Sequence, residues 1–359
     1  MVQPADNAPL APLTTLEVGG AAEHLVEAAT DAEVADALRW ARARGLSVTV
    51  LGGGSNVVVA DGGVRGLVLR IASRGIDIER RHDRALLTAA AGEPWDDVVA
   101  AAVADRLAGL ECLSGIPGTA GATPIQNVGA YGQEVAPVVD GVRVLHRLTL
   151  DERELTAAQC AFGYRTSALR RPDSPWIVLA IRFALRPDGP PTLGYSQVIE
   201  RFPGPSAPAL GEVRSAVLEL RRAKSMVIDD ADPNRRSAGS FFVNPVVDRE
   251  LAEAVVGRAR DLGVLAGEAR PPMHEVGQGR VKLSAAWLIE HAGFPRGCGR
   301  GRVGLSTNHA LAVVNRGGAS ADELVAFARE VRRGVRSHLG VDLHPEPVFF
   351  GFTSSDPTD

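Results

Sequence analysis

"GIPGTAGATPIQNVGAYG" occupies residues 115–132, and this stretch is the strongest indication of the fold. It is rich in glycine and contains no charged residue. It is too long for an ordinary turn, and long loops within compact domains usually carry function. Glycine also allows a ligand to approach the backbone closely. The stretch therefore predicts a binding loop rather than a simple connection.

Another glycine-rich stretch, "LGGGSN" (residues 51–56), follows a predicted strand. In chain order it is the first glycine-rich loop, and residues 115–132 form the second. It is not a P-loop, because no Gly-Lys-Ser/Thr follows it, and it lacks the spacing of a dinucleotide-binding fingerprint. Consecutive glycines can still direct backbone N–H groups at an anion. Taken alone, the stretch is equally consistent with a tight hairpin. Together, the two loops suit a ligand with two phosphates, such as a dinucleotide, but their spacing is equally consistent with two unrelated turns.

Helices and strands are predicted on both sides of these loops. A helix at residues 30–45 begins with Thr30 and Glu33 at capping-box spacing. Its apolar stripe consists of Val34, Ala37, Leu38 and Ala41. Further helices are predicted at residues 94–109, 211–224, 284–293 and 321–340, and strands at 46–51, 57–61, 67–71, 139–148, 176–185, 240–247, 309–315 and 347–351. This mixture predicts an α+β protein.

The composition is that of a globular protein able to bury a sizeable core, with 45% hydrophobic and 23% charged residues among 359. A net charge of -4 and the lack of a Lys/Arg run argue against nucleic acid as a partner. No apolar run is long enough to span a membrane, and the N-terminus does not resemble a signal peptide. The three cysteines form no CxxC pair and the histidines no HxxxH pair. These features predict a cytoplasmic protein without a catalytic metal.

Three isolated polar residues stand in apolar or rigid settings. Ser240 lies between Gly239 and two phenylalanines, Arg165 follows Tyr164 in "FGYR", and Glu346 lies between two prolines. Each has an ordinary explanation when taken singly: a strand serine, a surface arginine and a solvated glutamate in a turn. Their significance depends on the motifs around them.

The motifs "LGGGSN", "GIPGTAGATPIQNVGAYG", "FGYR", "SAGSFFVNP" and "PEPVFFG" follow one another here in the order and rough spacing of the MurB family, the UDP-N-acetylenolpyruvoylglucosamine reductases. The resemblance extends from about Thr15 to Gly351. It implies an α+β architecture: a two-part FAD-binding fold of the vanillyl-alcohol-oxidase (PCMH) type and a C-terminal α+β substrate domain. The expected division is a flexible tail at 1–14, FAD-binding subdomains at 15–75 and 76–224, the substrate domain at 225–351 and a tail at 352–359.

The resemblance also implies the chemistry. Members of this family use NADPH to reduce bound FAD, which then reduces the enolpyruvyl ether of UDP-N-acetylglucosamine to UDP-N-acetylmuramate, a precursor of peptidoglycan. By this similarity Ser240 is the proton donor, and Arg165 and Glu346 are the other catalytic residues. The assignment is chemically reasonable, because hydride addition creates enolate character beside a carboxylate, and that charge must be stabilised and then quenched.

Further residues are assigned by the same resemblance. Residues implied to bind non-covalent FAD are Leu51, Gly52, Gly53, Gly54, Ser55, Asn56, Ser114, Gly115, Ile116, Pro117, Gly118, Thr119, Gly121, Ala122, Gln126, Asn127, Gly129, Ala130 and Tyr131. Residues implied to contact the UDP-sugar substrate are Tyr131, Tyr164, Tyr195, Lys224, Asn244 and His309.

Two other functions remain open. An FAD oxidase of the same fold would act on a different small substrate, and "AGSFFVNP" argues against it. A nucleotide-binding regulator would have kept the fold and lost catalysis, against which the presence of Arg165, Ser240 and Glu346 argues. The expected partners are small molecules, the UDP-sugar and NADPH, with no nucleic acid and no membrane, and the expected state is a monomer.

Overall fold

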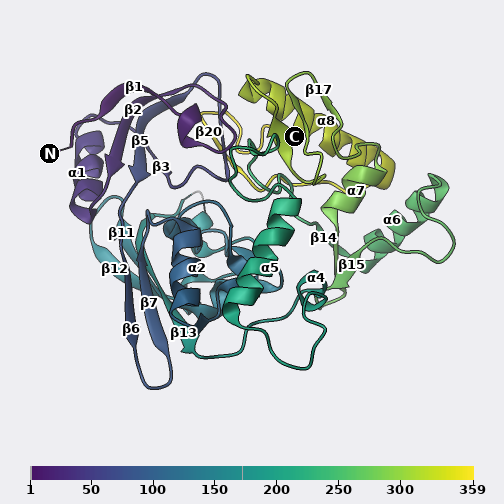
Figure 1. Cartoon of the computed structure of the whole chain (residues 1–359). Coiled ribbons are helices and arrows are strands. Elements are labelled where there is room, and N and C mark those ends of the chain that lie inside the picture. The colour runs from purple at the N-terminus through teal and green to yellow at the C-terminus, as the bar shows by residue number, and fades with distance from the viewer. Residues whose placement is uncertain (1, 172) are drawn as a thin grey trace. The chain divides into compact units, whose positions relative to one another are not determined.

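The computed structural model describes residues 2–171 and 173–359, and their contacts divide the chain into two units (Figure 1). Unit 1 contains the N-terminal residues up to Ala8, Ala22–Gly54 and Arg65–Ile228. Unit 2 contains Pro9–Ala21, Ser55–Val64 and Asp229–Asp359. Each unit is therefore assembled from segments that are distant in the sequence.

The first sheet of unit 1 has the strand order β1 (Ala5–Pro9), β2 (Ala21–Ala28), β5 (Val64–Ile71), β3 (Val48–Leu51). Helix α1 (Asp31–Arg42) has the predicted capping box, in which the Thr30 side chain accepts from the Glu33 N–H and the Glu33 carboxylate accepts from the Thr30 N–H. Its buried residues are Val34, Ala37, Leu38 and Ala41, so the predicted stripe is confirmed.

The second sheet of unit 1 is antiparallel and supports the second glycine-rich loop. Its order is β12 (Glu152–Thr156), β11 (Val139–His146), β13 (Trp176–Pro187), β7 (Ala85–Ala90), β6 (Ile76–Arg80), and β8 (Leu107–Ala108) also pairs with β13. Helix α2 (Trp95–Ala104) packs on it through Trp95, whose ring centroid lies 5.7 Å from that of Phe183. Helix α5 (Leu210–Ala223) ends at the cap residue Lys224, as predicted.

Unit 2 consists of short strands and three longer helices around its own core. One sheet has the strand order β14 (Val246–Asp248), β16 (Arg280–Leu283), β15 (Met273–Glu275). A second has the order β17 (Gly299–Arg300), β18 (Val303–Leu305), β19 (Val313–Asn315). The third is the parallel pair β20 (Val348–Phe350) and β4 (Val57–Val59). The helices are α6 (Arg249–Asp261), α7 (Ala285–His291) and α8 (Ala321–Leu339). The parallel pair joins segments from opposite ends of the chain.

Short elements complete both units. They are η1 (Ala11–Leu13), η2 (Glu111–Leu113), η3 (Ala120–Ala122), β9 (Gly129–Ala130), β10 (Gln133–Glu134), η4 (Ala136–Val138), α3 (Ala157–Cys160), η5 (Ala168–Arg170) and α4 (Ser196–Ile199). None of the helices in the described part of the chain combines the length and the apolar character that crossing a membrane requires.

The structure corrects several sequence predictions. The helix predicted to reach residue 109 ends at Ala104, because Arg106 has a positive φ of 55° and the chain then enters β8. The strand predicted at 240–247 is regular only from Val246 onward. Before it, the Phe241 N–H donates to the carbonyl of Leu311, and Phe242 forms an isolated bridge with Pro345.

Both predicted tails contain ordered contacts among their described residues. Residues 5–9 form strand β1 although their side chains are mostly exposed, because the strand is held by backbone pairing with β2 rather than by apolar burial. At the other end, Thr358 is fully buried and accepts from the side chain of Arg332 at 3.3 Å.

Candidate functional site

The two glycine-rich loops meet within unit 1. A Cβ atom on Gly53 would lie 2.8 Å from the Cα of Gly118, and one on Gly52 would lie 3.0 Å from Oγ1 of Thr119. Gly118 also has a φ of 121°, a conformation that side-chain-bearing residues rarely adopt. The sequence needs glycine here because the backbones of the two loops are in direct contact. They form one surface, which we call the glycine cradle (residues 52–54 and 115–121).

The second loop is fixed to the end of the antiparallel sheet. The Trp95 N–H donates to the carbonyl of Gly118 at 3.0 Å, and the Gly121 N–H donates to the carbonyl of Ala91 at 2.9 Å. A Cβ on Gly121 would lie only 2.5 Å from the Cβ of Ala91. The Gly115 N–H donates to Oδ1 of Asp96 at 2.6 Å. The cradle is therefore formed in advance of any ligand, which lowers the entropic cost of binding.

Asp96 itself is an anchor at the start of this loop. Its carboxylate also accepts from both terminal nitrogens of Arg214, at 2.6 and 2.8 Å. Burial works to raise the pKa of Asp96, but the hydrogen bonds from Arg214 and from the Gly115 amide outweigh burial and lower the pKa. Asp96 thus remains charged and helps to fix the loop.

One buried polar atom in the cradle lacks a hydrogen-bond partner among the described residues. Oγ1 of Thr119 is buried and has no hydrogen-bond partner within residues 2–171 and 173–359. Leaving a buried hydroxyl unsatisfied costs roughly 1–3 kcal/mol. This hydroxyl lies against Gly52, at the junction of the two loops. Its position and chemistry fit a hydroxyl or phosphate oxygen of a nucleotide cofactor, so the cradle fits the FAD that the sequence predicts.

Arg165 lies at the other end of the second loop, in a tight turn. The turn is closed by hydrogen bonds between Gly163 and Thr166, at 2.9 and 3.3 Å. Arg165 has a φ of 53°, in the left-handed region, and such strain in a residue other than glycine often accompanies function. Its guanidinium donates to the carbonyls of Asn127, at 3.3 Å, and Gly129. The guanidinium is thus held by the backbone of the loop that forms the cradle.

A third group in unit 1 contains residues predicted to contact the substrate. The rings of Tyr131 and Tyr195 meet edge to face with centroids 5.3 Å apart. Nζ of Lys224 lies 5.7 Å from the Tyr131 ring centroid and donates to Oε1 of Gln197 at 2.9 Å. Burial, followed by the nearby charge of Arg221, lowers the pKa of Lys224. A desolvated ammonium beside a second cation is well suited to bind an anion.

Arg221 belongs to this group and was not predicted. It is only 9% exposed, its Nη2 donates to the carbonyl of Met226, and its buried Nε has no partner in the described part of the chain. Burial also lowers its pKa. Its spacing in the helix could have revealed it, because Val213, Val217 and Arg221 follow one another at intervals of four, which places an arginine in an apolar stripe.

Unit 2 brings Ser240 and Glu346 into neighbouring segments. The Glu346 N–H donates to the carbonyl of Phe241 at 2.9 Å, next to the bridge between Phe242 and Pro345. Phe241 and Phe242 are 0% and 1% exposed, whereas Ser240 and Glu346 are half-buried. The hydroxyl and the carboxyl therefore come from segments that are joined by a backbone hydrogen bond.

Asn56, the last residue of the first glycine-rich stretch, lies beside the same segment in unit 2. Its side-chain Nδ2 donates to the carbonyl of Glu346 at 3.3 Å, and its own carbonyl accepts from the Val348 N–H at 3.0 Å. On the other side, the carbonyl of His309 accepts from the Ala312 N–H at 3.1 Å, just after the Leu311 carbonyl that holds Phe241. Asn56, Ser240, His309 and Glu346 thus lie on connected segments.

Two of the predicted site residues form side-chain hydrogen bonds with the protein backbone. Oδ1 of Asn244 accepts from the Ala285 N–H at 2.9 Å, at the start of α7. The hydroxyl of Ser114 is fully buried and donates to the carbonyl of Glu111 at 2.7 Å. Their roles toward a ligand stay predictions.

The predicted residues are therefore divided between the units. Arg165, Tyr131, Tyr164, Tyr195 and Lys224 lie in unit 1, and Ser240, Asn244, His309 and Glu346 lie in unit 2. The first glycine-rich stretch passes from unit 1 to unit 2 between Gly54 and Ser55. That the three catalytic groups meet at one ligand stays a prediction.

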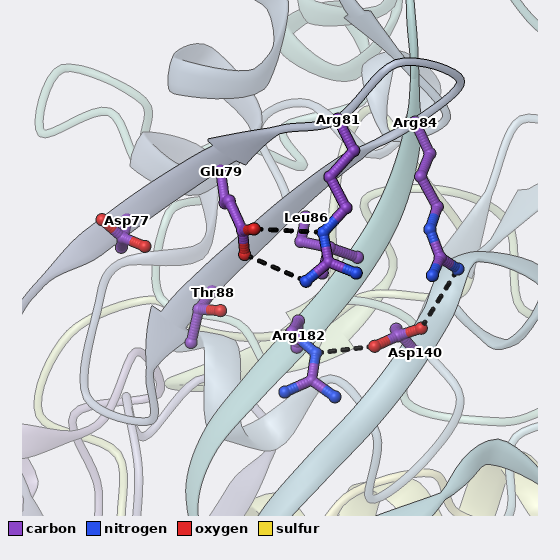
Figure 2. A pocket seen from close by; sticks show the side chains of 8 residues that line it. All are labelled: Asp77, Glu79, Arg81, Arg84, Leu86, Thr88, Asp140 and Arg182. Carbon is purple, nitrogen blue, oxygen red and sulfur yellow. Dashed lines mark hydrogen bonds and ion pairs between the residues drawn. The ribbon is translucent and has the colours of Figure 1, made fainter.

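A separate hollow of about 390 Å³ lies over strands β6, β7 and β13 of unit 1. Figure 2 shows the side chains that line it. Its charged side chains largely pair with one another: Arg81 with Glu79 at 3.1 Å, and Arg182 with Asp140 at 2.6 Å. It contains none of the predicted site residues, so it is a solvated sheet face rather than the candidate site. No group of His, Cys, Asp and Glu suited to a metal occurs among the described residues.

Comparisons with known proteins agree with this arrangement. Residues 22–149 match the FAD binding domain family, and residues 232–350 match the family of the UDP-N-acetylenolpyruvoylglucosamine reductase C-terminal domain. The reductase of that name from Streptomyces coelicolor is 46% identical over 355 residues, covering 98% of this chain and 91% of the relative. The one from Nocardia farcinica is 49% identical over 348 residues, covering 95% and 88%.

A solved structure is similar over the same length. The reductase (MurB) from Thermus caldophilus has a TM-score of 0.65 and 26% sequence identity, and the match covers 98% of this chain and 99% of that one. Together with the two family matches, it confirms the predicted α+β class with an FAD-binding domain ahead of a separate C-terminal domain.

Proposed function

The chain belongs to the UDP-N-acetylenolpyruvoylglucosamine reductase family, and we propose from this premise that it reduces the enolpyruvyl ether of UDP-N-acetylglucosamine to UDP-N-acetylmuramate. This reaction uses NADPH and belongs to the synthesis of the peptidoglycan precursor. The observation that carries the proposal is the similarity to named reductases over nearly the whole chain. The pairing of the Ser240 and Glu346 segments in unit 2 supports it.

The glycine cradle and Arg221 are the groups that would hold FAD and the phosphates of the ligands. When bound, FAD accepts a hydride from NADPH and donates one to the substrate alkene. Thr119 Oγ1 and the cradle backbone supply hydrogen bonds, and Arg221 and Lys224 supply positive charge against phosphate. A helix-borne arginine with a free, buried Nε suits a phosphate oxygen in particular.

Arg165 would stabilise the negative charge that develops on the substrate. Its guanidinium is already fixed by the carbonyls of Asn127 and Gly129, so little reorganisation is required as the charge develops. Removing one preorganised donor of this kind typically costs about 3–4 kcal/mol of transition-state stabilisation.

Ser240 would deliver the proton to the carbon beside the carboxylate, and Glu346 would bind or relay protons next to it. A serine hydroxyl is a weak acid in water, so it needs a fixed orientation and little bulk solvent around it. Ser240 precedes the fully buried Phe241 and Phe242 and is itself half-buried, which supports this. The backbone bond between Glu346 and Phe241 keeps the two polar groups on neighbouring segments.

Spectroscopy of the flavin tests the function directly. The purified protein should be yellow, and NADPH should bleach it in the absence of air. Enolpyruvyl-UDP-N-acetylglucosamine should then restore the colour anaerobically. Bleaching without this restoration would favour an FAD oxidase of another substrate, and a colourless protein would favour a nucleotide-binding regulator.

Replacing Gly53 by alanine should weaken FAD binding by about tenfold, because the new Cβ would lie 2.8 Å from the Gly118 backbone and force the two loops apart. The dissociation constant is measured by titrating the apoprotein with FAD and following its fluorescence. Gly62→Ala is the control, since a Cβ there meets open space. Unchanged FAD affinity in Gly53→Ala would contradict the assignment of the cradle.

A further inference from the structure

Arg332 contacts both ends of the segment that carries Glu346. It lies on α8 with 3% of its surface exposed. Its Nε and Nη2 donate to the two carboxylate oxygens of Asp342, at 2.8 and 2.7 Å. Its Nη1 donates to Oδ2 of Asp356 at 2.8 Å and to Oγ1 of Thr358 at 3.3 Å. Asp342 precedes Glu346 in the chain and Asp356 follows it.

The segment between these two aspartates, residues 342–356, is here called the Glu346 strap. Between its ends it is held at several points by backbone hydrogen bonds and at Glu346 also by the Asn56 side chain. The Val243 N–H donates to the carbonyl of His344 at 3.1 Å, and the Glu346 N–H donates to the carbonyl of Phe241 at 2.9 Å. After Glu346, the strap pairs with β4 through β20. The strap thus passes the Ser240 segment and returns to the same arginine.

The contacts of Arg332 with Asp342 and Asp356 are here called the clamp. The clamp is strong because its charges are partly shielded from solvent and their geometry is matched. Arg332 binds Asp342 through two parallel hydrogen bonds, the geometry in which a guanidinium holds a carboxylate best. These bonds from Arg332, with help from Arg336, keep the pKa of Asp342 far below its usual range despite the opposing effect of burial. A second aspartate binds the same guanidinium from the far end of the strap. Both ends are therefore tied to one rigid helix.

We propose that Arg332 is a positioning residue for the reduction of the substrate: by clamping both ends of the strap, it holds Glu346 beside the Ser240 segment in the orientation that protonation requires. The inference rests on the proposed function, because Glu346 must act on the substrate for its orientation to matter. A misplacement of about 1 Å in a reacting group can cost on the order of 10²-fold in rate.

The test removes the negative charge of Asp356 at the far end of the clamp only, where Thr358 and Asp359 also contact Arg332. Asp356→Asn keeps the size of the side chain and leaves the Arg332–Asp342 pair intact, so unit 2 should still fold. Anaerobic rapid mixing should show flavin reduction by NADPH within about twofold of the parent, and reoxidation by substrate about 10–100-fold slower. Substrate affinity, titrated on the oxidised flavin, should not change. Hydrogen exchange at the Glu346 amide should become faster.

Two comparisons give the test its specificity. Glu330→Gln removes an ion pair of α8 with Arg300, at 2.6 Å, that lies outside the strap, and both half-reactions should be unchanged. In a Glu346→Gln background, adding Asp356→Asn should cause no further loss, because a positioning effect has nothing left to position.

Additive losses in the double variant, or equal losses in both half-reactions of Asp356→Asn, would overturn the positioning role and leave the cluster purely structural. If Glu346→Gln alone leaves reoxidation unchanged, the proposed role of Glu346 fails, and the positioning role fails with it. Faster exchange at the Glu346 amide would then still identify the clamp as a stabilising contact, which separates the two failures.

Discussion

Ser240→Ala should leave the reduction of the flavin by NADPH unchanged and slow its reoxidation by substrate about 10³-fold, because positioned proton transfer contributes about 10²–10⁴ in rate. Reduction of the flavin involves no proton from Ser240, whereas reduction of the substrate requires one. The substitution removes only an oxygen from a half-buried side chain, so the stability of unit 2 should change little. The two rates are measured separately by anaerobic stopped-flow absorbance.

Ser237→Ala is the matched control for this variant. Ser237 lies in the same loop, and its hydroxyl accepts a long hydrogen bond, 3.4 Å, from the Gly239 N–H. Both half-reactions should stay within about twofold of the parent in this control. A Ser240→Ala enzyme that loses both half-reactions equally, or neither, would refute the proton-donor assignment.

Arg165→Met should produce the second largest effect, a loss of about 10²–10³ in substrate reduction, which corresponds to the roughly 3–4 kcal/mol that a preorganised donor provides. Arg165→Lys should recover little of the loss, because an ammonium cannot bind the carbonyls of Asn127 and Gly129 and still present a flat pair of donors to a carboxylate. Single-turnover reoxidation of the reduced flavin measures both variants.

Arg153→Met tests whether the loss of any arginine in unit 1 has this effect. Arg153 stacks over the ring of Trp176 at 5.7 Å, on strand β12. Its replacement should leave reoxidation unchanged. If Arg165→Met changed only the affinity for the substrate and not the rate at saturation, Arg165 would be a binding residue without a role in the chemistry.

Local signals in the sequence predict local structure well in this chain. The capping box at Thr30 and the apolar stripe of α1 depend on residues within one helix, and the end of α5 at Lys224 is correctly predicted. The glycine-rich loops were predicted to let a ligand approach the backbone closely, and the structure adds a direct contact between the loops at Gly53 and Gly118. These features are predictable because the residues that cause them lie close together in the sequence, or because glycine is needed for a particular backbone conformation.

Pairing between segments that are distant in the chain could not be predicted from the sequence. Strand β1 has exposed side chains and is held by its neighbour's backbone, so no hydrophobic pattern indicates it. The segment around Ser240 has the apolar composition of a strand, yet its hydrogen bonds go to Leu311 and to the Glu346 segment instead of a regular sheet. Arg221 differs from these cases, because its place in the apolar stripe of α5 is visible in the sequence, although charged residues are mostly exposed.

The parallel pairing of β4 with β20 has a consequence for biosynthesis. Val59 leaves the ribosome long before Phe350, and at about 5–20 residues per second the interval is on the order of 15–60 s. During that time strand β4 of the nascent chain lacks its parallel partner β20, and Glu346 has not yet been synthesised. Chaperone occupancy of the emerging polypeptide should therefore persist until translation is nearly finished, even after the N-terminal helix has formed.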